Sequence, residues 1–176
     1  MEAFKKFETE RLWIRPTSAD DASFVFELMN SQKWLQFIGD RNIETLADAQ
    51  AYITYKMIPQ LKKLGYSNYT VVRKIDKTKI GSCGLYDREG LDGIDIGFAF
   101  LPQYEGMGYA FECARRLQRA AHEEFGITQL YAITTKENLA SQRLLKKLQF
   151  KLLETISLPS DPKPLILYTF TFNELW

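Results

Sequence analysis

Two glycines, Gly106 and Gly108, stand one residue apart in the stretch QYEGMG. The apolar run IDIGFAFLP before them is typical of a strand, and YAFECARRLQRAAHEEFG after them repeats apolar residues at helical spacing. A glycine turn at the start of a helix exposes backbone N–H groups, and the helix dipole favours negative charge there. The stretch therefore predicts an anion-binding turn, although an ordinary strand-to-helix turn that needs glycine's conformational freedom would also explain it.

Two common phosphate-binding motifs do not fit this turn. A Walker loop requires Lys followed by Ser or Thr, and neither follows Gly106 or Gly108. A dinucleotide fingerprint requires a third glycine where this chain has Phe111, and the preceding strands resemble hairpins rather than a βαβ unit. The remaining interpretation is a pyrophosphate at the N-terminus of the helix that begins near Tyr109.

The other elements follow from hydrophobic periodicity and turn signals. The patterns predict strands at RLWIRP, YSNYTVVRKID, KIGSCGLYD, GIDIGFAFL, QLYAITT, KLLETIS and LILYTFTF, the last two around a loop, LPSDPKP. They predict helices at TSADDASFVFELMN, at 45–64 with a kink or break near Pro59, at 109–125 and at NLASQRLLKKLQF. This order of hairpins and helices predicts an α+β fold with a mixed sheet, in one domain over residues 1–176.

Composition narrows the classes of partner. A net charge of +1 gives no sign of a nucleic-acid or membrane partner held by bulk charge. Cys83 and Cys113 lack metal-ligand spacing, so we expect reduced cysteines and no metal. The charged start MEAFKKFETERL is unlike a signal peptide, and no apolar run reaches the ~18–20 residues that span a bilayer. We therefore expect a soluble, cytoplasmic protein, and the sequence leaves a homodimer open.

Several ordered motifs together resemble the GCN5-related N-acetyltransferase (GNAT) superfamily. Its Q/R-x-x-G-x-G/A signature is matched by Gln103, Gly106 and Gly108, and its N-x-x-S segment by Asn138 and Ser141. ETERLWIRPTSADDA is similar to the opening of the branch that acetylates the N-termini of ribosomal proteins. The resemblance implies a central mixed, mostly antiparallel sheet, splayed between its fourth and fifth strands, with helices on both faces.

The resemblance also implies acetyl-CoA as the cosubstrate, without a metal. Its pantetheine would bind the backbone of the fourth strand, and its pyrophosphate would bind the amides from Tyr104 to Tyr109. Asn138 would contact the pantetheine, or serve only as a helix N-cap. The implied contacts are Phe98, Ala99, Phe100, Gln103, Tyr104, Glu105, Gly106, Met107, Gly108, Tyr109, Asn138 and Ser141.

Acetyl transfer needs a neutral amine, a polarised thioester carbonyl and a protonated leaving thiolate. The resemblance implies that a backbone N–H near Phe98 polarises the thioester carbonyl. Many relatives protonate the thiolate with a tyrosine where this chain has Leu145, and the ribosomal branch uses a serine that Ser141 matches. Ser141 is therefore the expected acid, with a plain helix-surface hydroxyl as the alternative. Asp95 is the candidate base, and it either acts through water or only pairs with a cation.

The acceptor is an amine, and we expect the N-terminal α-amine of a protein. Trp34 and Phe37 would line the acceptor cleft, although core packing explains them equally well. Asp161, in the last hairpin loop, is a second candidate carboxylate. Two alternatives stay open: a small amine such as a polyamine, amino acid or antibiotic, and a non-catalytic CoA-binding module, which Leu145 in place of the tyrosine favours.

Overall fold

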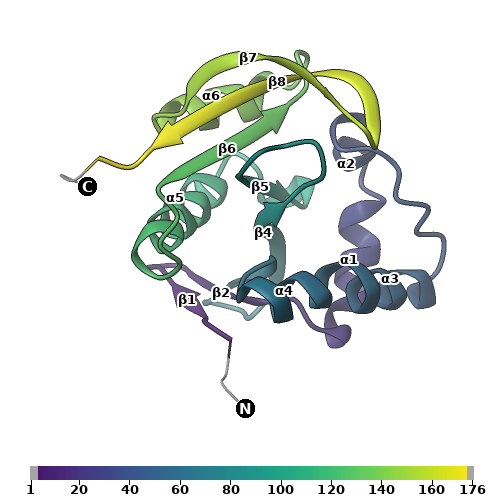
Figure 1. Ribbon diagram of the computed structural model, residues 1–176. Helices are drawn as coiled ribbons and strands as arrows, with labels where there is room; N and C mark the ends of the chain where they lie inside the picture. Colours follow the sequence, from purple (N-terminus) through teal and green to yellow (C-terminus); the bar gives the residue numbers. More distant parts are fainter. Residues whose placement is uncertain (1–3, 174–176) are drawn as a thin grey trace.

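The computed structural model describes residues 4–173, whose strands form one eight-stranded sheet in the order β1-β2-β3-β4-β5-β6-β8-β7 (Figure 1). The strands are β1 (Phe7–Glu8), β2 (Leu12–Pro16), β3 (Asn68–Arg73), β4 (Lys79–Asp87), β5 (Ile94–Phe100), β6 (Gln129–Thr134), β7 (Lys151–Leu158) and β8 (Asp161–Thr171). Neighbouring strands are antiparallel except for β5 and β6, which are parallel. This arrangement confirms the predicted α+β fold with a mixed, mostly antiparallel sheet.

The helices lie where periodicity predicted them, with two differences. They are α1 (Ala22–Met29), α2 (Gln32–Phe37), α3 (Leu46–Tyr52), α4 (Ile58–Leu64), α5 (Tyr109–Glu123) and α6 (Leu139–Lys147). The break predicted near Pro59 is present but lies slightly earlier, because the π turn η2 (Ile53–Met57) separates α3 from α4. Pro59 occupies the first turn of α4, where a missing N–H costs little. The short helix α2 was not predicted. Short 3-10 turns, η1 (Ala19–Asp21) and η3 (Pro102–Tyr104), precede α1 and α5.

The sheet opens between β5 and β6. β5 pairs with β4 along its whole length, from Ile94 to Phe100. With β6, by contrast, it pairs only at Ile94↔Leu130 and Asp95↔Tyr131. Beyond Asp95 this edge of β5 therefore has no strand partner in the described chain. The predicted splay between the fourth and fifth predicted strands is confirmed, and the two-residue β1 is an additional strand at the sheet edge.

Hydrophobic cores lie on both faces of the sheet. The larger core packs α5 against the central strands, and Ile96 and Phe100 of β5 point into it. The second core joins α1, α3 and η2, and Ala99 packs against it from the same strand. Because successive strand residues point to opposite faces, Asp95, Gly97 and Ala99 all lie on the face of the second core.

The C-terminal hairpin, β7 and β8, forms one end of the sheet and contacts the loop between β4 and β5. Its turn is shorter than the predicted loop LPSDPKP, because β8 already begins at Asp161. A Cβ on Gly90 in the β4–β5 loop would lie 2.5 Å from Cδ of Pro159, so the two loops are in close contact. The hairpin thereby bounds the region beyond the open edge of β5.

Candidate functional site

The turn between β5 and α5 has the backbone geometry that glycine allows. Gly106 and Gly108 have φ angles of 73° and 82°, in the left-handed region that other residues rarely adopt. Gly108 is the N-cap of α5, and a Cβ on Gly106 would meet no heavy atom within 4 Å. The two glycines therefore shape an open turn directly at the start of a 15-residue helix.

Backbone hydrogen bonding shows which N–H groups of this turn are free. The N–H groups of Tyr104 and Glu105 donate to the carbonyl oxygens of Leu101 and Pro102, at 2.9 and 3.2 Å. These two amides are therefore already used within η3, although the resemblance implied that they would bind the pyrophosphate. Within residues 4–173, the N–H groups of 106–108 have no backbone acceptor, and those of the first turn of α5 cannot have one inside the helix. The free amides, which we call the cradle, thus begin at Gly106 and continue into the first turn of α5.

Arg11, from the turn between β1 and β2, contacts one side of this cradle. Its Nη1 donates to the Met107 carbonyl oxygen at 3.0 Å, and its guanidinium pairs with Glu112 at 2.7 Å. Burial opposes ionisation of Glu112, but hydrogen bonds from Thr9 and Arg11 outweigh it and lower its pKa. On the other side Lys33 of α2 pairs with Glu105. Both carboxylates next to the cradle are therefore neutralised by a cation.

A groove beside the N-terminus of α5 adds positive charge. Its lining residues are Glu10, Arg11, Gly108, Phe111, Glu112, Arg115, Arg116 and Arg119. Four arginines against two glutamates raise the local potential, which favours an anionic ligand at the adjacent turn. A pyrophosphate fits this set of free amides, helix dipole and flanking cations.

The open edge of β5 leads from the cradle to the point where β5 and β6 meet. Phe98 and Ala99 are partly exposed along it, whereas Phe100 is buried. An extended chain carrying amide groups could hydrogen-bond to this edge as an added strand would. The unpaired edge and the free amides are therefore neighbours in the chain, joined by η3, and could bind an extended amide-bearing arm and a pyrophosphate together.

α6 begins beyond the end of β6, the strand that diverges from β5. Asn138 is the N-cap, and its side-chain oxygen accepts from the N–H of Ser141 at 3.1 Å. The Ser141 hydroxyl is partly exposed and has no hydrogen-bond partner in the described part of the chain. Leu145, one turn later on the same helix face, is 1% exposed and belongs to the main core. The buried hydroxyl of Thr135, at the end of β6, also lacks a partner and was missed by the sequence analysis.

Asp95 lies at the apex of the opening and forms an ion pair with Arg88. Nε and Nη2 of Arg88 donate to the two carboxylate oxygens at 3.0 and 3.2 Å. Burial raises the pKa of Asp95, and Arg88 offsets part of that rise. Of the two roles expected for Asp95, this geometry favours pairing with a cation. Arg88 was not singled out from the sequence, because nothing in the loop around it forms a motif.

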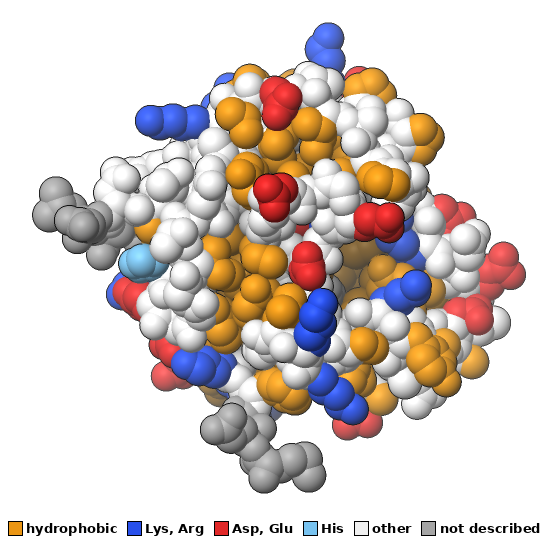
Figure 2. Space-filling model, viewed as in Figure 1, with side chains coloured by type: hydrophobic (Ala, Val, Ile, Leu, Met, Phe, Trp, Pro, Cys, Tyr) orange, Lys and Arg blue, Asp and Glu red, His pale blue; other side chains and the backbone are white. Residues whose placement is uncertain are grey.

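The three residues predicted for the acceptor lie on two different elements. Trp34 on α2 packs against the second core, and its buried Nε1 has no hydrogen-bond partner in residues 4–173. Phe37, on the same helix, is partly exposed. Asp161 begins β8, where its side chain accepts from the N–H of Lys163 at 3.1 Å. Figure 2 shows a hollow between the β4–β5 hairpin and helices α1 to α3, with hydrophobic side chains inside and charges of both signs around it.

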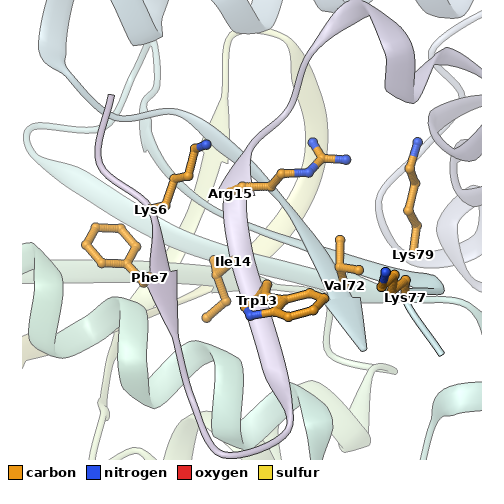
Figure 3. A pocket seen from close by; sticks show the side chains of 8 residues that line it. All are labelled: Lys6, Phe7, Trp13, Ile14, Arg15, Val72, Lys77 and Lys79. Atoms are coloured by element: carbon orange, nitrogen blue, oxygen red, sulfur yellow. The ribbon is translucent and has the colours of Figure 1, made fainter. Parts of the chain in front are cut away.

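A second groove, on the outer part of the sheet, contains none of the predicted site residues (Figure 3). Its lining residues are Lys6, Phe7, Trp13, Ile14, Arg15, Val72, Lys77 and Lys79. Two of its cations, Arg15 and Lys79, already pair with the buried Asp21. We assign this groove no part in the reaction.

Residues 4–173 contain no group of three His, Cys, Asp or Glu side chains arranged to hold a metal ion. None of their helices is both long enough and apolar enough to cross a membrane.

Comparison with known proteins agrees with the geometry. A family model described as an acetyltransferase (GNAT) domain matches residues 11–151. The Bacillus subtilis protein named uncharacterized N-acetyltransferase YnaD is 26% identical over 140 residues, which cover 80% of this chain and 79% of that protein.

Solved structures share the fold at lower identity. One is RimL, described as a ribosomal L7/L12 alpha-N-protein acetyltransferase in complex with coenzyme A: its TM-score is 0.80 at 15% identity, covering 96% of this chain and 98% of that chain. Another is the aminoglycoside acetyltransferase AAC(6')-Ib in complex with coenzyme A, with a TM-score of 0.73 at 20% identity, covering 91% and 94%. At these identities the likeness concerns the fold alone.

Proposed function

Because the chain belongs to the GNAT acetyltransferase family, we propose that it transfers an acetyl group from acetyl-CoA to a primary amine. The observation that carries this proposal is the open edge of β5, which runs from the free amides at Gly106–Gly108 to the apex at Asp95. The proposed partners are acetyl-CoA and an amine acceptor in the cytoplasm, without nucleic acid or metal.

We assign cofactor binding to the backbone of this edge and turn. The backbone of Phe98, Ala99 and Phe100 would hydrogen-bond the pantetheine, and the N–H groups that follow Glu105 would hold the pyrophosphate. Acetyl-CoA supplies a thioester whose acyl group can be passed to an amine. A backbone N–H of the open edge near Phe98 would stabilise negative charge on the carbonyl oxygen as the amine attacks.

Ser141 is the proposed proton donor to the leaving sulfur. Its hydroxyl is free of other partners in the described chain, and the N-cap bond from Asn138 fixes the turn that carries it. As the new C–N bond forms and the C–S bond breaks, the hydroxyl would give its proton to the sulfur and regain one from water. The amine must lose its own proton, and Asp95 could accept it only through a water molecule, because Arg88 bonds both carboxylate oxygens.

We propose that the acceptor is the N-terminal α-amine of a protein. The similarity of the opening segment to the ribosomal-protein branch supports this acceptor, as does the shared fold with RimL. A small amine is the second candidate, because AAC(6')-Ib has the same fold and its name states an aminoglycoside acceptor.

Release of free thiol from acetyl-CoA tests the function directly. The assay would compare peptides with free N-termini, including ribosomal-protein N-termini, with polyamines, amino acids and aminoglycosides. We expect turnover with at least one peptide and a higher kcat/KM for peptides than for polyamines. Turnover confined to aminoglycosides or polyamines would replace the proposed acceptor, and no thiol release with any amine would contradict the transfer reaction itself.

A further inference from the structure

The ion pair between Arg88 and Asp95 presents its cation, not its carboxylate, to the outside. The Asp95 side chain is 1% exposed, whereas the Arg88 side chain is 29% exposed. Arg88 donates to both oxygens of Asp95, so the carboxylate has little freedom to bind anything else. A buried carboxylate of this kind serves as an anchor that fixes the guanidinium above it.

A second contact, with the ring of Tyr86, also fixes the position of Arg88. Its guanidinium carbon lies 5.3 Å from the ring centroid of Tyr86, within cation–π range. The Tyr86 ring itself lies across Gly84 and Gly97, which face each other on β4 and β5. A Cβ on Gly97 would lie 2.9 Å from Cε2 of Tyr86, so this strand position admits the ring only because it is glycine. Burial raises the pKa of Tyr86, so its hydroxyl stays neutral beside the cation.

The pair stands just beyond the point where the acetyl group would arrive, which the proposed function places near Phe98. Asp95 is the last residue of β5 that pairs with β6, so the open edge ends beside it. In the proposed function the pyrophosphate lies at the other end of that edge, and the pantetheine arm runs toward the apex. Asp95 and Gly97 point to the face of α1 and α3, the side on which Figure 2 shows the hollow. Arg88 therefore lies on the acceptor side of the reacting end.

The guanidinium retains unused donors. Arginine has five N–H donors, and Asp95 accepts one from Nε and one from Nη2. Nη1 of Arg88 has no hydrogen bond within residues 4–173, and it is not among the buried unpartnered atoms, so solvent reaches it. A fixed cation with outward-facing N–H groups binds carbonyl and carboxylate oxygens.

We propose that Arg88 binds the carbonyl or carboxylate oxygen next to the acceptor amine, with Asp95 as its anchor. This inference rests on the proposed acetyl transfer and deepens it. A peptide N-terminus and a free α-amino acid both carry such an oxygen on the carbon adjacent to the amine-bearing carbon. A polyamine has none and brings a second positive charge, which Arg88 repels. The acceptor class is therefore an α-amino carbonyl compound.

Two amines of matched shape test this role. Alaninamide and 2-aminopropane both place the amine on a carbon with a methyl group, and only alaninamide has the carbonyl oxygen. We expect Arg88→Met to lower the ratio of kcat/KM for alaninamide to kcat/KM for 2-aminopropane by about tenfold or more. Arg88→Lys, which keeps the charge without the planar fork, should lower the ratio less. Because both amines meet the same protein, a general loss of folding or cofactor affinity cancels from the ratio.

A double variant, Arg88→Met with Asp95→Leu, removes the uncompensated carboxylate that the single change leaves buried. It should show the same lowered ratio as Arg88→Met. An unchanged ratio in both variants overturns the proposal and leaves the acetyltransferase function intact. A further collapse with both amines in the double variant would show that Asp95 acts on the amine, which overturns its role as an anchor. Wild-type protein that acetylates neither amine nor any peptide would contradict the proposed function as well.

Discussion

At the scale of single residues, the first turn of α6 shows how much a local motif can reveal. Asn138 was expected either to contact the pantetheine or to serve as an N-cap, and the structure has the capping bond. The hydroxyl of Ser141, the expected acid, has no protein partner in residues 4–173. The partner of Asp95 could not be predicted in this way. Arg88 reaches it only because the β4–β5 loop turns back, which depends on left-handed glycines at 90 and 93.

Ser141→Ala should lower kcat more than tenfold while changing the KM for acetyl-CoA little. A group that acts only as the sulfur leaves affects turnover rather than ground-state binding, and general acid assistance is worth about 10²–10⁴-fold in favourable cases. The fold should be unaffected, because the capping bond uses the backbone N–H of this residue and not its hydroxyl. Steady-state kinetics with the best amine provide the measurement.

Ser157→Ala, at an exposed position of β7, is the matched control and should retain wild-type kinetics. If Ser141→Ala stays within about twofold of wild type, a difference of ~0.4 kcal/mol in activation free energy, the proton comes from elsewhere. Leu145 is no substitute, because a leucine side chain has no proton to donate.

At the scale of elements, the glycines of the β5–α5 turn were predicted to form an anion-binding turn, and they adopt a left-handed backbone that uses glycine's conformational freedom. Which amides of this turn are free was not predictable. The 3-10 turn η3 uses the amides of Tyr104 and Glu105, and such a short turn has no distinct sequence pattern. The helix α2 was missed for a similar reason: six residues are too few for helical periodicity to show.

Gly106→Val should weaken acetyl-CoA binding at least tenfold, because a branched side chain would stand among the free amides of the cradle and resist the positive φ. Gly126→Val is the matched control. Gly126 has a φ of 66° against 73° at Gly106, and a Cβ at either position would meet no heavy atom within 4 Å. Both variants therefore carry a similar backbone strain, and only one of them touches the cradle.

Titration calorimetry with acetyl-CoA, accompanied by circular dichroism, compares the two variants. Equal affinities in the two folded proteins would show that Gly106 is only a turn residue. Equal losses of affinity would indicate that strain, and not blockage of the cradle, accounts for the effect.

At the scale of the whole molecule, the strands themselves were predictable and their arrangement was not. Alternation placed Ile96 and Phe100 on one face of β5, and the structure buries both in the core against α5. The order of the strands and the divergence of β5 from β6 depend on pairings between residues far apart in the chain, for which local patterns hold no information. The divergence was expected only from the resemblance to a known family, and the two-residue pairing of β5 with β6 bears it out. The strand order was not predicted.

The central claim is that the open edge of β5 and the adjoining turn bind coenzyme A, and the melting temperature with and without acetyl-CoA tests it most directly. At a hundredfold excess over its dissociation constant, a ligand that binds only the folded protein adds ~2.7 kcal/mol to the free energy of unfolding. For a chain of this length that corresponds to a rise of about 5–11 °C. ATP and NAD, at the same concentration, should cause a much smaller rise, because neither carries the pantetheine arm that pairs with the strand edge. A melting temperature that acetyl-CoA leaves unchanged, or that ATP and NAD raise equally, would contradict the account.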